Sequence, residues 1–304
     1  LDYSIEGKTE EDDFDATVSE IIETIHKAQE NSSTPFAVFK VTGICAFDVL
    51  ENANQGIDKL AGNYIEKYKK LIERVDAICT AAFKANVPIF IDAEETWIQD
   101  AIDLIAEQMS KKYNQEAVIV FNTLQLYRHD RLSFFRNELE KAKIGGYKLG
   151  MKLVRGAYME KERARAKEKG YTSPIQVSKE ATDNDFNEGL RLAIENIDNV
   201  SLCAGTHNEE SAIILTALLA EFNIKSDDNR VYFAQLLGMS DHISYNLAHR
   251  NYNVAKYVPY GPIKEVLPYL IRRAEENTSV AGQTSRELSL IIKEQKRRKS
   301  ESRR

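Results

Sequence analysis

The stretch "FAVFKVTGIC" (residues 36–45) distinguishes between the two common folds that contain a parallel sheet. It begins with four apolar residues in a row, which is typical of a strand buried on both faces. An open doubly wound sheet normally places a glycine-rich G-x-G-x-x-G turn after its first strand. This stretch has a single glycine, Gly43, and therefore lacks that motif. Its absence favours a barrel over a dinucleotide-binding sheet.

Further apolar runs of the same kind recur along the chain. They are "VPIFIDAE" (87–94), "AVIVFNT" (117–123), "GMKLVRG" (150–156), "VSLCAGTH" (200–207), "RVYFAQLLG" (230–238) and "NVAKYVPYG" (253–261). Amphipathic stretches between the runs predict helices at 14–29, 56–85, 96–112, 128–144, 176–196, 208–222 and 240–250. A chain of strand-then-helix units favours a parallel sheet with helices outside it.

The opening "LDYSIE" (residues 1–6) can supply the end of an eighth strand. Eight strands that alternate with eight helices form a (β/α)8 barrel, and a chain of 304 residues is long enough for one. We therefore predict an α/β fold of the TIM-barrel type, with an open doubly wound sheet as the alternative. No internal repeat or long linker divides the chain, so we predict that residues 1–304 form a single domain.

The composition excludes several classes of protein. The chain is 43% hydrophobic and 29% charged, which is typical of a globular protein with a buried core. Its net charge of −6 provides no basic field, so we predict no nucleic-acid partner. The three cysteines lack the C-x-x-C spacing of a zinc site or a disulfide framework, which fits a reducing compartment.

The C-terminal segment "KEQKRRKSESRR" (residues 293–304) differs from the rest of the chain, because it carries seven basic residues and only two acidic ones. We predict that it is a solvated, frayed tail. The alternative is a peripheral contact with an anionic membrane, to which clustered lysines and arginines are attracted.

Polar residues follow almost every predicted strand. They are Glu6, Lys40, Asp92, Glu94, Gln125, Lys152, Arg155, Thr206, His207, Asn208, Gln235 and Tyr257. In a (β/α)8 barrel the carboxyl ends of the strands meet at one end, where active sites lie. Burying polar groups is unfavourable unless they find partners, so the pattern predicts a mouth that binds a polar ligand.

The residues at this mouth favour neither a metal nor a nucleophile. His207 with Asp92 and Glu94 would be an incomplete ligand set, and the other four histidines fall in predicted helices, so we predict no metal. Cys45 follows a strand, but nothing marks it as a reactive thiol, and a buried structural cysteine is the simpler interpretation. The remaining interpretation is an organic cofactor with a small charged substrate.

The stretch "YLIRRAEEN" (residues 269–277) places Tyr269, Arg272, Arg273 and Glu276 on nearly one face of a predicted helix. An ion pair between the arginines and Glu276 on a solvated helix would explain this spacing by itself. The other interpretation is a helix whose paired guanidinium groups bind an anionic ligand.

Together, six motifs resemble the flavin-dependent proline dehydrogenase (proline oxidase) family, in its monofunctional-type catalytic domain. They are "IDAEET" (91–96), "MKLVRGAYMEKE" (151–162), "THN" (206–208), "QLLGM" (235–239), "YVPYG" (257–261) and "YLIRRAEEN" (269–277). The resemblance implies a distorted (β/α)8 barrel that holds FAD at its mouth, with the final helix lying over the active site. It also implies that L-proline is oxidised to Δ1-pyrroline-5-carboxylate by hydride transfer to flavin N5, with the electrons passed to a membrane quinone in proline catabolism.

The resemblance implies roles for the residues around the substrate. Arg272, Arg273 and Lys40 match the residues that bind the carboxylate of proline, a group that paired guanidinium groups hold well. Tyr257 and Tyr269 match the aromatic residues that pack on the proline ring.

Three further residues match positions at the family's substrate site. Leu153 is expected beneath the proline ring, and Asp92 matches a carboxylate near the substrate. Glu6 matches a glutamate that pairs with Arg272 as a gate. Both Asp92 and water stay open as the acceptor of a proton from the substrate amine.

The resemblance places a second set of residues around FAD. They are Gln125, Lys152, Arg155, Gly156, Ala157, Tyr158, Thr206, His207, Asn208, Gln235 and Glu276. Lys152 differs from some members of the family, which have arginine there. Its positive charge near flavin N5 is kept, but a bidentate contact is not. For Tyr158 and Gln235, support of the barrel is the alternative role.

Two other functions stay open. A hydroxyproline dehydrogenase has the same fold and cofactor, and a barrel that binds an amino acid without catalysis is the more distant alternative. In the resembled family a tyrosine at the position of Tyr257 goes with proline, and a smaller residue goes with hydroxyproline. The implied location is cytoplasmic with a peripheral contact to a bacterial inner membrane, or mitochondrial in a eukaryote.

Overall fold

The computed structural model describes residues 1–3, 10–264, 266–267, 270–271 and 283–301. The described strands form one parallel sheet in the order β8-β7-β6-β5-β4-β3-β2-β1-β9. They are β1 (Asp2–Tyr3), β2 (Ala37–Lys40), β3 (Ile89–Asp92), β4 (Val120–Gln125), β5 (Leu149–Val154), β6 (Val200–Gly205), β7 (Val231–Leu236), β8 (Val254–Tyr257) and β9 (Pro259–Tyr260).

The sheet closes into a barrel where the last strand bends. β8 pairs with β7, β9 pairs with β1, and only Val258 separates β8 from β9. The backbone N–H of Asp2 donates to the carbonyl oxygen of Val258 over 3.0 Å, so the hydrogen bonding continues across the bend. Pro259 has no N–H to donate, which suits a strand that changes partners there. The predicted (β/α)8 barrel is therefore confirmed, and its distortion lies in this divided strand.

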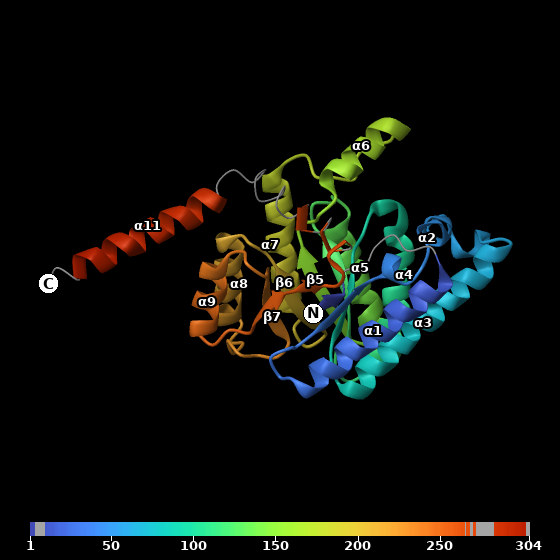
Figure 1. Ribbon diagram of the computed structural model, residues 1–304, viewed down its shortest axis with the longest axis horizontal. Coiled ribbons are helices and arrows are strands. Elements are labelled where there is room, and N and C mark those ends of the chain that lie inside the picture. The colour runs from blue at the N-terminus through green and yellow to red at the C-terminus, as the bar shows by residue number, and fades with distance from the viewer. Residues whose placement is uncertain (4–9, 265, 268–269, 272–282, 302–304) are drawn as a thin grey trace.

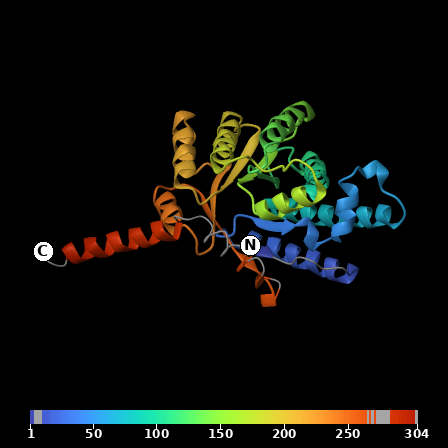
Figure 2. The same ribbon diagram turned by 90° about the horizontal axis from the view of Figure 1, so that it is seen from above.

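Helices pack around the outside of the barrel, and α1 and α3 lie side by side (Figure 1, Figure 2). The described helices are α1 (Glu11–Glu30), α2 (Phe47–Ala53), α3 (Asn63–Ala85), α4 (Thr96–Tyr113), α5 (Arg131–Gly145), α6 (Met159–Lys169), α7 (Lys179–Glu195), α8 (Glu209–Glu221), α9 (Asp241–His249) and α11 (Gln283–Glu301). Two short 3-10 turns, η1 (Val41–Gly43) and η2 (Ile57–Lys59), follow β2 and α2.

Three segments differ from the helices that the sequence predicts. The predicted helix over 56–85 is interrupted, because Gly62 has a φ of +60° and α3 begins only after it. α2 and α6 are helices that the sequence patterns did not predict. α2 has only 7 residues, and α6 buries only Glu162 and Ala166, so neither shows a clear apolar stripe.

The C-terminal segment is helical, so the prediction of a frayed tail is wrong for its described part. Glu294 forms ion pairs with Arg297 and Arg298 at 2.8 Å, one helical turn away, and such pairs stabilise a helix. α11 projects away from the barrel (Figure 1, Figure 2). Residues 268–269 and 272–282, which include most of the helix expected over the active site, lie outside the described residues.

A cluster of aromatic rings fills the interior of the barrel. The ring centroids of Phe36 and Phe90 are 4.4 Å apart, and those of Phe90 and Phe121 are 5.1 Å apart. Gly150 of β5 leaves room for these rings, since a Cβ atom there would lie 2.6 Å from Cγ of Phe121. The cluster forms an apolar floor below the carboxyl ends of the strands.

Gly150→Ala should destabilise the fold by about 1–3 kcal/mol, the usual effect of overpacking a core. The added methyl group would also lie 2.6 Å from the carbonyl oxygen of Val120, which cannot move without disturbing the sheet. Chemical denaturation measures the change in unfolding free energy. Gly189→Ala in α7 is the matched control, because its methyl group would meet only the end of the Leu153 side chain, at 3.1 Å. Equal losses in the two variants would contradict the packing of the interior.

Candidate active site

Four charged side chains are buried near the carboxyl ends of the strands. Lys152 of β5 donates to Asp92 of β3, with 2.5 Å between Nζ and Oδ1. Lys40 of β2 pairs with Asp2 of β1, with 3.6 Å between Nζ and Oδ2. The hydroxyl group of Tyr257, at the end of β8, donates to Oδ2 of Asp92 over 2.9 Å. Residues far apart in the sequence thus form one cluster in the mouth of the barrel.

The register of the strands explains why these residues meet. Lys40 and Asp92 are paired positions of β2 and β3, and Lys152 is paired with Thr123 of β4. Alternate residues of a strand face opposite sides of the sheet, and these positions face the interior. Thr123 therefore lies between the two partners of the ion pair, and its hydroxyl group donates to Oδ1 of Asp92 over 3.4 Å.

Asp92 stays ionised despite its burial. Burial by itself would raise the pKa of this carboxyl group, but the charges of Lys152 and Lys40 and the hydrogen bonds from Lys152 and Tyr257 outweigh it. They hold the pKa of Asp92 below its ordinary value. A carboxylate in this state is a poor acceptor for a proton near neutral pH. The arrangement suits Asp92 to holding Lys152 and Tyr257 in place.

Aromatic rings enclose the ammonium group of Lys152. Its Nζ lies 5.1 Å from the ring centroid of Phe90 and 4.8 Å from that of Tyr257. Cation–π attraction of this kind is strongest where water is excluded, and Lys152 is buried. The ion pair and the two rings fix one positive charge at the end of β5.

The residues expected around a cofactor follow β4 to β7. Gln125 of β4 donates to the carbonyl oxygen of Glu94 (2.7 Å) and accepts from the N–H of Ala157 (3.2 Å). Gly156 has a φ of +133°, and a Cβ atom there would lie 2.5 Å from the ring of Tyr127. Only glycine lets the chain turn here after β5, and the turn leads directly into α6.

Arg155 joins the end of β5 to β6 and to two helices. Its guanidinium group donates to Asp183 (2.6 Å), to the Thr206 hydroxyl (2.7 Å) and to the Ser211 hydroxyl (2.9 Å). Asn208 is the N-cap of α8, since its side chain accepts from the N–H of Ser211 over 3.1 Å. These contacts fix the loop after β6, although they use hydrogen-bonding groups that a cofactor would also need.

Two other residues expected near the cofactor contact α9 or its N-cap. The side-chain amide of Gln235 donates to the carbonyl oxygen of Thr206 (3.1 Å) and accepts from the Ser244 hydroxyl (2.9 Å). Nδ1 of His207 lies 3.0 Å from the Ser240 hydroxyl. Gln235 is buried against α9, so its side chain supports the barrel in this structure.

The prediction that Leu153 lies beneath the substrate ring is wrong. Its side chain is fully buried in the outer core, which includes Phe186 and Leu190 of α7. Its neighbour Lys152 faces the interior, and successive residues of a strand face opposite sides. The ring of Phe90, which the sequence analysis did not single out, lies on the inner side, with its centroid 5.1 Å from Nζ of Lys152.

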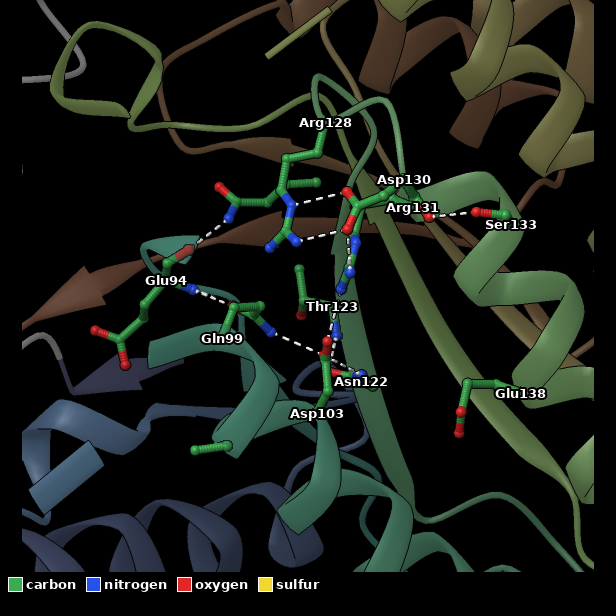
Figure 3. A network of polar contacts seen from close by, with 12 residues as sticks. Glu94, Gln99, Asp103, Asn122, Thr123, Arg128, Asp130, Arg131, Ser133 and Glu138 are labelled. Carbon is green, nitrogen blue, oxygen red and sulfur yellow. Dashed lines mark hydrogen bonds and ion pairs between the residues drawn. The ribbon is translucent and has the colours of Figure 1, made fainter. Parts of the chain in front are cut away.

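A buried polar network, also missed from the sequence, holds the segment after β3 (Figure 3). Gln99 of α4 accepts from the N–H of Glu94 (2.8 Å) and donates to Asp103 (2.9 Å). Asp103 also accepts from Arg131 of α5 over 2.6 Å. The available signal was the presence of Gln99 and Asp103 on the helix face that also carries Ile102, where apolar residues are usual.

Glu94 is another buried carboxyl group beside the mouth. Its oxygens accept from the N–H (3.1 Å) and the hydroxyl group (2.5 Å) of Thr42. Burial raises the pKa of Glu94 to about 8, and the charge of Glu95 acts in the same direction, although the Thr42 hydrogen bonds and Lys40 oppose the rise. Glu94 therefore carries its proton at neutral pH, whereas Asp92 does not.

Five of the predicted site residues lie outside the described residues: Glu6, Tyr269, Arg272, Arg273 and Glu276.

Among the residues that the structure does describe, no three His, Cys, Asp or Glu side chains gather as a metal would require. The three cysteines are free and buried, and burial raises the pKa of Cys45 to about 12. No helix among the described residues is long and apolar enough to cross a membrane.

Comparison with known proteins shows the family to which this barrel and its motifs belong. The model of the proline dehydrogenase family matches residues 1–286. The chain belongs to the proline dehydrogenase family. The resemblance inferred from the sequence motifs is therefore confirmed.

The chain matches only part of the length of its named relatives. The chain is 38% identical over 243 residues to proline dehydrogenase 1, mitochondrial, of Drosophila melanogaster, an alignment that covers 77% of this chain and 36% of that protein. It is 37% identical over 254 residues to the hydroxyproline dehydrogenase of Xenopus laevis, covering 82% of this chain and 54% of that protein. The alignments thus span about a third to a half of these relatives.

A solved structure supports the barrel. Proline utilization A (PutA) from Bdellovibrio bacteriovorus, crystallised after inactivation by N-propargylglycine, superposes with a TM-score of 0.80. The superposition covers 92% of this chain and 30% of that protein at 19% identity. At this low identity the likeness shows the fold alone.

Glu94→Gln should abolish the part of the decrease in unfolding free energy with rising pH that comes from ionisation of Glu94. The pKa of Glu94 rises on folding from its ordinary value of 4.5 to about 8, so the native state disfavours ionisation of this group. Its stabilising contribution is complete below pH 4.5 and is lost as the pH rises through about 8. Glutamine has nearly the same shape and can still bond to both groups of Thr42.

The measurement is the free energy of unfolding at several pH values between about 5 and about 8. Over this range the unmutated protein should lose at least about 1 kcal/mol more than the variant does. Parallel pH profiles of the two proteins would contradict a raised pKa for Glu94.

Proposed function

We propose that this protein is an FAD-dependent enzyme that oxidises L-proline to Δ1-pyrroline-5-carboxylate in proline catabolism. The observation that carries the proposal is the arrangement of the buried pair Asp92 and Lys152 with the half-buried Tyr257 at the mouth of a barrel of this family. It supplies a fixed positive charge and an oriented aromatic ring above an apolar floor. A small, charged, cyclic substrate fits these features.

Lys40 is the described member of the carboxylate clamp. Its ammonium group is buried at the end of β2, paired with Asp2 and next in register to Asp92. We assign Arg272 and Arg273 to the same clamp from the sequence motif alone, with Glu6 as the gate and Tyr269 on the proline ring. A charge-assisted contact to the substrate carboxylate in such a site contributes about 1.5–3 kcal/mol.

Bound FAD would supply the hydride acceptor, its N5 atom, for the ring carbon next to the proline nitrogen. The ends of β4 to β7 suit such a group, because the buried Lys152 supplies a fixed positive charge there. The residues assigned to hold it are Gln125, Lys152, Arg155, Gly156, Ala157, Tyr158, Thr206, His207, Asn208, the backbone at Gln235, and Glu276.

Water, rather than Asp92, accepts the amine proton in this proposal. The pKa of Asp92 is held below its ordinary value by Lys152 and Lys40, so the carboxylate gains little by taking a proton. Asp92 instead positions Tyr257 and Lys152, and it contributes to catalysis through them.

The remaining assignments follow from the family. In this proposal residues 1–304 form one catalytic barrel domain, and α11 is its C-terminal helix. The electrons pass to a quinone in a membrane, and the protein works at that membrane surface, at a bacterial inner membrane or in a mitochondrion. The Drosophila relative, which is named as mitochondrial, supports the second location for a eukaryotic source.

Steady-state turnover with a soluble quinone analogue tests the proposal, with L-proline and trans-4-hydroxy-L-proline as parallel substrates. The purified protein should show the absorbance of bound flavin and should prefer L-proline. Turnover of hydroxyproline alone would favour the alternative, to which the Xenopus relative corresponds. Bound amino acid without flavin or turnover would identify a non-catalytic barrel.

Tyr257 should determine the choice between the two substrates. The hydrogen bond to Asp92 holds the phenol ring of Tyr257 in place. The 4-hydroxyl group of a bound hydroxyproline would therefore lose its water against this ring without gaining a hydrogen-bond partner. The kcat/KM for L-proline should exceed that for hydroxyproline at least tenfold, or about 1.4 kcal/mol. Tyr257→Ser should narrow this gap, mainly by reducing the value for proline.

Tyr257→Phe is the matched control. It removes only the hydroxyl group that donates to Asp92 and keeps the ring. It should keep the preference for proline even if kcat falls. A preference that is lost equally in the Phe and Ser variants would show that the hydrogen bond, not the ring, sets the specificity.

A further inference from the structure

None of the residues assigned to the active site lies on α11, and this helix exposes large aliphatic side chains. Leu288, Ile291 and Ile292 are 56%, 56% and 42% exposed. Their spacing of three and four residues places them on one face of the helix. Soluble proteins seldom leave such a group uncovered, so this face marks a site of interaction.

Basic residues continue the helix directly after these side chains. They are Lys293, Lys296, Arg297, Arg298 and Lys299, all largely exposed. Over the whole of α11 the sequence has six Lys and Arg against three Glu, while the complete chain carries a net charge of −6. α11 is therefore a cationic segment on an acidic protein.

The position of α11 separates it from the barrel. The family model ends at residue 286, near the start of α11, and the helix projects away from the sheet (Figure 1, Figure 2). The apolar face and the basic residues thus stand at the periphery, where a large flat partner can reach them.

We propose that α11 is an amphipathic helix that binds the surface of an anionic lipid bilayer. The aliphatic face enters the boundary between headgroups and acyl chains, and the basic residues lie against the lipid phosphates. The helix lies along the surface, since it is not apolar enough to cross a bilayer. Charge complementarity favours this partner over a second copy of the chain, which would bring two cationic helices together.

A bilayer also explains the aliphatic side chains better than a nucleic acid does. Phosphates of DNA or RNA would attract the lysines and arginines, but they offer no apolar layer for Leu288, Ile291 and Ile292. The inference rests on the proposed function in one respect only, namely that attachment would bring the barrel close to a membrane quinone. Lipid binding itself can be measured without any turnover.

Sedimentation with vesicles tests the proposal. Vesicles of phosphatidylcholine alone and vesicles containing phosphatidylglycerol are mixed with the full chain. The protein should bind the anionic vesicles at least tenfold more tightly. Raising the salt from about 0.1 M to about 1 M should weaken binding, because it shortens the Debye length from about 10 Å to about 3 Å.

Two sets of variants separate the contributions of the helix. Combined replacement of Leu288, Ile291 and Ile292 by Ser should weaken binding to anionic vesicles at least tenfold. Combined replacement of Lys293, Lys296 and Lys299 by Gln should weaken it to a similar degree and reduce its salt dependence. A chain that ends at Arg286 should lose binding altogether.

Matched controls change exposed residues elsewhere. Ile144→Ser with Val177→Ser alters two of the most exposed aliphatic side chains, and Lys27→Gln with Lys59→Gln and Lys84→Gln removes three other surface charges. Both should bind vesicles like the unmutated protein. All variants should keep their turnover with a soluble quinone analogue, which separates a failure here from a failure of the proposed enzyme activity.

Three results would overturn the proposal. The first is equal binding to neutral and anionic vesicles. The second is unchanged vesicle binding in the chain that ends at Arg286. The third is a dimer in solution that the Ser variants abolish while vesicle binding is absent, which would identify a second copy as the partner of this face.

Discussion

The ion pair between Asp92 and Lys152 is the interaction on which the mouth of the barrel depends. Its two residues come from β3 and β5, which are not neighbours, so the pair forms only when both strands keep their register against β4. Loss of one partner would leave an unpaired buried charge, which is typically destabilising by about 3–5 kcal/mol. The pair therefore links the geometry of the sheet to the electrostatics of the candidate site.

The aromatic floor gives this pair its setting. Phe90 stacks on Phe36 and also faces the ammonium group of Lys152, so one ring joins the apolar interior to the charged layer above it. Buried charges are screened less than surface charges. The same setting explains two opposite pKa shifts, since Asp92 has two cations close to it, whereas Glu94 is held mainly by neutral hydrogen-bond donors.

The charges inside the barrel and those on α11 differ in burial and in their partners. Inside, Lys152 and Lys40 each pair with a carboxylate, so the site has a fixed local charge pattern suited to one small ligand. On α11 the cations are exposed and clustered beside aliphatic side chains, which suits an extended surface. The two proposals therefore place recognition of the substrate and attachment of the protein on separate parts of the chain.

By itself the sequence determined the strands, the barrel and the family, because continuous apolar runs mark buried parallel strands and the motifs fall at their ends. It also indicated the residues that reach the mouth, namely Lys40, Asp92, Lys152 and Tyr257. Only the tertiary structure decided that Leu153 faces the helices, that Gln235 bonds to α9 and that Asp2 pairs with Lys40. The physical reason is that a strand buried on both faces lacks the alternation of polar and apolar residues that would reveal its inner side. That side is fixed only by its register in the closed barrel.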